Sequence, residues 1–108
     1  MSQTITYRIP GFSDYDFEWD ETKQASNRAK HGIDFRDAAA AFLKPSGTYT
    51  IQDDRFDYGE TRLVTYAMIG RKLATIVHTE RPTGLRIISA RWASTNEQNH
   101  YRQAAAER

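Results

Sequence analysis

Residues 62–92 read RLVTYAMIGRKLATIVHTERPTGLRIISARW and carry the strongest strand pattern of the chain. They hold three segments rich in Val, Ile, Thr and Tyr, namely Arg62–Ile69, Lys72–His78 and Leu85–Ala90. Gly70-Arg71 separates the first two segments, and Arg81-Pro82-Thr83-Gly84 separates the second from the third. Short connections of this composition are typical of hairpin turns. The sequence therefore predicts a meander of three antiparallel strands.

Three segments upstream of the meander also carry strand patterns. Thr48–Gln52 is rich in Thr and Tyr, and a polar loop separates it from the meander. Tyr15–Trp19 alternates aromatic residues with acids, which is the period-two pattern of a strand with one buried face. Thr4–Ile9 alternates as well, and it either adds an edge strand or forms a loose arm. We therefore predict an antiparallel sheet of four to five strands.

Capping signals place two helices between the first strand and the later ones. Asp20 is an N-cap candidate for a helix over 21–31, which ends in Lys30-His31-Gly32, two cations followed by glycine. Asp34 is the N-cap candidate for a second helix, which ends before Pro45 and Gly47. The second helix carries one apolar stripe at i, i+3, i+4 and i+7, made of Phe35, Ala38, Ala39 and Phe42.

A third helix closes the chain. Ser94 followed by Glu97 is a capping-box pattern, and Tyr101, Ala104 and Ala105 share one side of the helix that it opens. The order of elements is then βααββββα, which indicates an α+β fold with two helices packed on one face of the sheet and a C-terminal helix.

Length and composition bound the class of protein. The chain has 108 residues, 39% hydrophobic and 27% charged, as in one globular domain. It has no cysteine, which excludes disulfides, thiolate metal sites and a cysteine nucleophile. The longest apolar run, 38–43, is far shorter than the roughly 20 residues that a membrane helix needs. No secretory signal pattern opens the sequence, so we expect no membrane association and a cytoplasmic location.

The charges are unevenly distributed along the chain. Residues 1–60 carry 11 acidic and 7 basic side chains, whereas residues 61–108 carry 3 acidic and 8 basic ones. A basic excess of this kind is typical of a surface that contacts phosphates.

Several short motifs, in this order and spacing, resemble the BrnT toxin family. The match extends from Phe17 to about Tyr101. Its residues are Glu18-Trp19-Asp20, Lys23, Asn27, Lys30-His31-Gly32, Phe35, Phe42, Asp57-Tyr58-Gly59-Glu60, Arg62, His78-Thr79-Glu80-Arg81, Arg86-Ile87-Ile88-Ser89-Ala90-Arg91, Glu97 and Tyr101.

The resemblance implies a ribonuclease of a type II toxin–antitoxin pair with a RelE-like fold, which cuts RNA and arrests growth. It also implies a ribbon-helix-helix antitoxin, similar to BrnA, that neutralises the toxin and represses their shared operon. Operator DNA is then bound only through the toxin–antitoxin complex. Residues 15–108 form a single BrnT-like domain in this interpretation, and residues 1–14 are the N-terminal arm or extra edge strand.

Metal-free cleavage of RNA needs a base for the 2′-hydroxyl proton, cations for the phosphate charge and an acid for the leaving oxygen. Arginine suits the second role, because its planar fork binds two phosphate oxygens. Pairing around Gly70-Arg71 brings the start of one strand, Arg62, beside the end of the next, Arg81. We predict that these two form a phosphate clamp, joined by Arg86 or Arg91. Glu60 lies on the same rim as a candidate base.

Strand alternation sorts the remaining arginines. Arg86 and Arg91 are five residues apart and should point to opposite faces, unless a bulge intervenes. Ile87 and Ile88 are apolar on opposite sides, so this strand should be central, with helices on one face and a second cover, such as the antitoxin, on the other.

Other candidates have a functional and a structural interpretation. His31 is an acid or base candidate, and Lys30 a phosphate contact, but both also suit the C-terminus of a helix. Tyr58 is a candidate for stacking on a base, and Lys72 for contacting RNA. Trp19 and Phe42 are expected in the core. His78 and His100 lack metal-ligand spacing, so we expect no metal and no cofactor.

A second function remains open. The domain is then a catalytically silent module that docks a DNA-binding partner, and its basic strand residues pair with that partner's acids. The structural alternative for the four arginines is ordinary salt bridges in a sheet, and for Glu60 it is a surface pair with Arg62.

Overall fold

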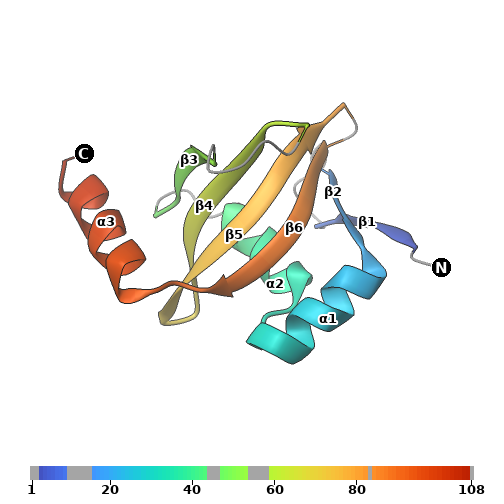
Figure 1. Ribbon diagram of the computed structural model, residues 1–108, viewed down its shortest axis with the longest axis horizontal. Helices are drawn as coiled ribbons and strands as arrows, with labels where there is room; N and C mark the ends of the chain where they lie inside the picture. The colour runs from blue at the N-terminus through green and yellow to red at the C-terminus, as the bar shows by residue number, and fades with distance from the viewer. Residues whose placement is uncertain (1–2, 10–15, 44–46, 54–58, 83, 108) are drawn as a thin grey trace.

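The computed structural model describes residues 3–9, 16–43, 47–53, 59–82 and 84–107. Their elements follow the order β1 (Thr4–Arg8), β2 (Asp16–Asp20), α1 (Glu21–His31), α2 (Phe35–Phe42), β3 (Tyr49–Asp53), β4 (Arg62–Ile69), β5 (Lys72–Arg81), β6 (Gly84–Trp92) and α3 (Thr95–Ala106). Figure 1 shows α1 and α2 together beside the sheet and α3 apart from them, next to β3. The fold class is α+β, as predicted, and it is consistent with the RelE-like fold.

The strands form one sheet in the order β1-β2-β6-β5-β4-β3. It has six strands rather than four or five, because Thr4–Arg8 pairs with β2 and so is an edge strand. One neighbouring pair is parallel rather than antiparallel, since β6 returns alongside β2 in the same direction. This pair requires glycine at Gly84, where φ is 146° and an added Cβ would overlap the carbonyl of Asp16.

The predicted meander is confirmed. Ile69 pairs with Lys72 across the Gly70-Arg71 turn, and β5 continues to Arg81, where it pairs with Gly84 of β6. β6 lies between β2 and β5 and is therefore central, as its adjacent isoleucines predict.

A bulge interrupts β6. Val77 of β5 pairs with Ser89, whereas the next residue, His78, pairs with Ile87, so Ile88 is an extra residue on the β6 strand. An extra residue reverses the alternation beyond it. Consequently Arg86 and Arg91 share a face, opposite Thr79 and Thr75 of β5. The two arginines would point apart only in an unbroken strand.

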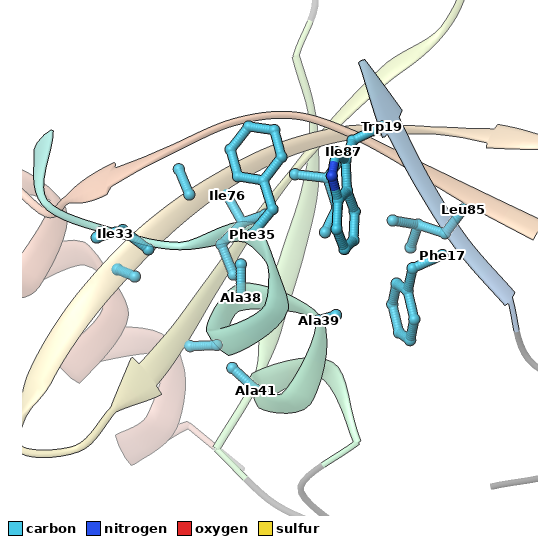
Figure 2. Close-up of a cluster of buried hydrophobic side chains, with 13 residues drawn as sticks. Phe17, Trp19, Ile33, Phe35, Ala38, Ala39, Ala41, Ile76, Leu85 and Ile87 are labelled. Carbon is cyan, nitrogen blue, oxygen red and sulfur yellow. The ribbon is translucent and has the colours of Figure 1, made fainter. Parts of the chain in front are cut away.

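The hydrophobic core lies between α2 and the sheet. Trp19 and Phe17 of β2, Phe35 of α2, and Ile76 and Ile87 of the central strands are at most 2% exposed. Figure 2 shows these side chains meeting between the helix and the strands. Trp19 and Phe35 pack edge to face with ring centroids 5.9 Å apart, a favoured aromatic geometry. Phe42 packs against this cluster, so both predicted core aromatics are confirmed.

The predicted caps form as expected. The Asp20 carboxylate accepts from the backbone of Thr22 and Lys23, and Gly32 ends α1 in the left-handed region with φ 76°. Asp34 caps α2, and Ser94 with Glu97 makes a complete capping box on α3. Each cap satisfies backbone groups that a helix end leaves without partners.

Asn27 fastens α1 to the sheet. Its buried amide donates to the carbonyl oxygen of Ala90 (2.8 Å) and accepts from the backbone N–H of the same residue (3.1 Å). β2 pairs with β6 only at Leu85 and Arg86, so further along β6 this side chain takes the place of a neighbouring strand. Buried backbone groups need such partners.

A polar chain on the helix-covered side of the sheet leads from the exposed Thr50 to the buried Thr65 and His78. The hydroxyls of Thr50 and Thr65 lie 2.7 Å apart, and Thr65 Oγ1 lies 2.7 Å from His78 Nε2. The His78 ring is 3% exposed and contacts the edge of Phe42. Burial lowers the pKa of His78 to about 4, because the charged imidazolium would lose its hydration.

Among the described residues, no helix is long and apolar enough to cross a membrane.

Replacing Asn27 by alanine should lower the free energy of unfolding by about 2 to 4 kcal/mol, because both backbone groups of Ala90 lose their buried partner. Urea denaturation measures this change. Ser26→Ala is the matched control, since Ser26 is exposed on the same helix, and we expect it within about 0.5 kcal/mol of the wild type. Equal stabilities for the two variants would contradict the anchoring role.

His78 should make stability pH-dependent. The unfolded chain binds a proton at His78 near pH 6.5, whereas the folded chain binds it only near pH 4. The contribution is therefore complete above pH 6.5 and declines as the pH falls to 4. We expect the stability advantage of the wild type over His78→Gln to shrink by roughly 3 kcal/mol between pH 7 and 4. A constant difference across that range would show that His78 titrates normally.

Candidate functional site

One face of the sheet is left open by α1 and α2. We call it the open face. It is formed by alternate residues of three strands, namely Arg62, Val64 and Tyr66 of β4, Thr75, Val77, Thr79 and Arg81 of β5, and Arg86, Ser89 and Arg91 of β6. All four arginines that the sequence singles out lie on it. α3 borders the open face at its β3 edge, where His100 contacts the rings of Tyr49 and Tyr66.

Glu60 brings two of these arginines together. One carboxylate oxygen lies 3.3 Å from Arg81 Nη2, and the other lies 3.8 Å from Arg62 Nε. Arg62 begins β4 and Arg81 ends β5, so the hairpin register places them at the same end of the sheet. Glu60 and Arg81 line a groove of about 400 Å³, together with Thr61, Leu63, Thr79, Glu80 and Pro82. We call it the Glu60 groove.

Arg86 is held on the neighbouring strands. It lies opposite Thr79 of β5 on one side and Glu18 of β2 on the other, and its Nη1 lies 3.2 Å from the Glu18 carboxylate. Because Thr79 also lines the Glu60 groove, Arg86 lies next to this groove. The structure thus brings together Glu60, Arg62 and Arg81, whereas the Arg86 side chain is paired with Glu18 on the neighbouring strand.

Arg91 lies elsewhere on the open face. It is opposite Thr75 of β5. Thr75 precedes Arg81 by six residues, which corresponds to about 20 Å along the strand. Arg91 therefore does not join the other three arginines around one phosphate. It lines a second groove, of about 350 Å³, between the sheet and Glu97 of α3. We call it the α3 groove.

A carboxylate holds Arg91 in a fixed orientation. Both Nη atoms donate to Glu97 at 2.7 Å, and the same carboxylate accepts from Thr75 (3.3 Å) and from the Ser94 backbone (2.8 Å). Burial favours a higher pKa for Glu97, but the bonds from Arg91 and Ser94 outweigh it and hold the pKa at about 2. The capping box predicts the bond to Ser94, but no sequence pattern predicts the arginine fork.

A third groove lies along α1, and its lining includes basic side chains but no acidic one. It holds about 320 Å³ and is lined by Lys23, Ser26, Asn27, Lys30, His31, Ile88 and Ser89. We call it the α1 groove. His31 is half-buried and Lys30 is exposed. His31 therefore lines a different groove from Glu60, and the structure does not bring these two proton-transfer candidates together.

Two RNA-contact candidates remain. Lys72 is exposed at the start of β5, with its Nζ 5.3 Å from the centre of the Trp92 ring, which is a cation–π distance. Arg71, Lys72 and Trp92 line a separate groove of about 350 Å³. Tyr58 lies outside the described residues.

The charged side chains of the open face are suited to binding an anion such as phosphate rather than a metal ion. In the described part of the chain, no three His, Asp or Glu side chains are grouped as metal ligands. Glu60 of this groove is a carboxylate, which can accept a proton, and it is paired with the guanidinium groups of Arg81 and Arg62, which can hold negative charge. A base and cations are two of the three functions that metal-free cleavage of RNA needs.

Residues 19–97 match the family described as the ribonuclease toxin BrnT of type II toxin–antitoxin systems. The chain belongs to the BrnT toxin family. The match spans α1 through the start of α3, and hence the Glu60, α3 and α1 grooves of this BrnT toxin. BrnT toxins are ribonucleases, and a type II toxin implies an antitoxin partner and an RNA substrate. No curated protein matches the chain.

Proposed function

We propose that this BrnT toxin is a metal-independent endoribonuclease that cleaves RNA in the Glu60 groove. The observation that carries the proposal is the position of the Glu60 carboxylate between the guanidinium groups of Arg81 and Arg62, at 3.3 and 3.8 Å. The family supplies ribonuclease activity. The groove supplies a base next to two cations, so the charge of the transition state can be held without a metal ion.

In this proposal each proton that moves has a named donor and a named acceptor. Glu60 accepts the proton of a 2′-hydroxyl, and the 2′-oxygen attacks the adjacent phosphorus. The bond to the 5′-oxygen breaks, which leaves a 2′,3′-cyclic phosphate and a 5′-hydroxyl. The 5′-oxygen takes its proton from water, since His31 lines the α1 groove instead. Arg81 and Arg62 bind the non-bridging oxygens as charge builds on them.

The existing ion pairs are compatible with substrate binding. The side chains of Glu60, Arg62 and Arg81 are 31%, 25% and 41% exposed, and such pairs contribute only about 0 to 1 kcal/mol. A phosphodiester can therefore replace the carboxylate as the partner of the guanidinium groups. Displacement from these cations turns Glu60 toward the 2′-hydroxyl.

The remaining candidates are assigned by position. Arg86 joins the clamp from the adjacent strand, because Thr79 lies both opposite it and in the Glu60 groove. Arg91 and His31 line the other two grooves, where they contact RNA away from the cleaved bond. Lys30, Lys72 and Tyr58 are assigned as further RNA contacts.

The partner in this proposal is a ribbon-helix-helix antitoxin similar to BrnA. It covers the open face, which α1 and α2 do not cover, and it carries the complex to operator DNA. The toxin itself binds no DNA in this arrangement. Toxin, antitoxin and RNA meet in the cytoplasm.

The function is tested with purified toxin, single-stranded RNA and excess chelator. We expect cleavage to persist, with 2′,3′-cyclic phosphate at the new ends, since no metal takes part. Product ends are analysed by mass spectrometry. RNA that stays intact in chelator but is cut after Mg²⁺ is added would overturn the metal-free mechanism, and RNA that stays intact under both conditions would overturn the enzymatic proposal.

Substitutions in the Glu60 groove assign the roles. Glu60→Gln should lower kcat by about 10²- to 10⁴-fold through loss of the base, and Arg81→Gln by about 10²- to 10³-fold through loss of one charge donor. Asp37→Asn and Arg28→Gln are matched controls, because both side chains are exposed on helices outside this groove. Wild-type kcat in Glu60→Gln would remove Glu60 from proton transfer.

The antitoxin proposal predicts that expression of the toxin alone arrests growth and that co-expression of the ribbon-helix-helix partner restores it. Arg62→Glu combined with Arg81→Glu should abolish both cleavage and toxicity. If that variant loses only partner binding, and the wild type shows no cleavage and no toxicity, the chain is the silent docking module instead.

A further inference from the structure

The basic side chains of this protein differ in whether they form an ion pair with a carboxylate. The four arginines of the open face each lie within 4 Å of a carboxylate of the same chain. By contrast, Lys23, Lys30 and His31 form no ion pair with any residue that the structure describes. Among the described residues, cations without an ion-pair partner therefore lie in the α1 groove, and also at Arg71 and Lys72 of the groove beside Trp92, rather than at the predicted clamp.

The two elements that form the α1 groove, α1 and β6, are held together by hydrogen bonds. Asn27 bonds both backbone groups of Ala90, which holds α1 against β6. Lys23 and Lys30 lie four residues before and three residues after Asn27, so all three share one stripe of the helix. The two lysines are separated by about 10 Å along the axis. They form an elongated pair of charges, which suits an extended polyanion better than a single small anion.

The α1 groove meets the α3 groove at Ser89. Ser89 lines both the α1 groove and the α3 groove, and the bulge at Ile88 exposes this part of β6 to α1. Val77 lies opposite Ser89, and Thr79, two residues further along β5, lines the Glu60 groove. Ser89 and the paired strand β5 thus give a route from the α1 groove, past the α3 groove, toward the clamp.

We propose that the α1 groove is a subsite for the RNA backbone that flanks the cleaved bond, with Lys23 and Lys30 contacting its phosphates. This inference rests on the proposed function and specifies where its substrate extends. The lysines act on affinity for long RNA, because the nearest proton-transfer group at the cleaved bond, Glu60, lines a different groove.

The choice of RNA over a protein partner follows from the shape and charge of the groove. The lining residues include two exposed lysines and one apolar side chain, Ile88. Protein interfaces are depleted in lysine at their centres. Contacts with a phosphate backbone are made largely by such flexible cations.

The experiment compares Lys23→Gln/Lys30→Gln with Arg28→Gln/Arg102→Gln, a control that removes two exposed cations outside the grooves. Binding is measured with 2′-O-methyl RNA, which lacks the nucleophile and is not cleaved. We expect the lysine variant to bind roughly tenfold more weakly at low salt. Its log–log salt slope should fall by about 1.4, which is about 0.7 for each of the two phosphates that the lysines neutralise. The control variant should match the wild type in both quantities.

Cleavage of long RNA and of a dinucleotide provides the second readout. The ratio of kcat/KM for long RNA to that for the dinucleotide should fall roughly tenfold in the lysine variant, through KM. Thermal unfolding confirms equal folding of the variants. An unchanged salt slope and an unchanged ratio would overturn the subsite, as would loss of antitoxin binding without loss of RNA binding. If the wild type cleaves nothing, the endoribonuclease proposal fails, but the salt slope still decides whether RNA occupies the groove.

Discussion

The single extra residue in β6 determines which side chains meet on the open face. Without the bulge at Ile88, alternation would send Arg86 and Arg91 to opposite sides of the sheet. One of them would then point into the packed layer between the sheet and the two helices, where a charge is costly. The bulge keeps both guanidinium groups out of the core and leaves Ile87 buried. The α3 and α1 grooves, which residues of β6 line, therefore depend on the local register of this one strand.

The open face combines fixed and exchangeable charges. Arg91 is fixed, because its two bonds to Glu97 are short and the carboxylate is also bonded to Ser94 and Thr75. Arg62 and Arg81 meet Glu60 at longer distances and are partly exposed, so their partner can be exchanged. The difference follows from burial and bond geometry, since a bidentate, half-buried pair is much harder to separate than a loose surface pair.

Local signals in the sequence predict local structure well. Asp20, Asp34 and Ser94 define the helix starts, and the Gly70-Arg71 turn sets the register that brings Arg62 near Arg81. Long-range features leave no comparable pattern. The parallel pairing of β2 with β6, the bond from Asn27 to Ala90 and the fork between Arg91 and Glu97 each join segments through tertiary packing. For this reason the sequence predicts the strands and helices that carry the candidate residues better than it predicts the division of these residues among three grooves.

The position of β6 also bears on how the chain acquires its structure during translation. The β1–β2 hairpin and the β3–β5 strands leave the ribosome before β6, yet in the sheet they lie on opposite sides of it. The sheet therefore stays divided into the β1–β2 pair and the β3–β5 strands until β6 pairs with both β2 and β5. Pairing between segments that are far apart in the sequence slows folding. Since Arg86 and Ser89 belong to the inserting strand, no shorter nascent fragment holds the assembled surface. The assembled surface of this BrnT toxin therefore forms only after β6 has been synthesised.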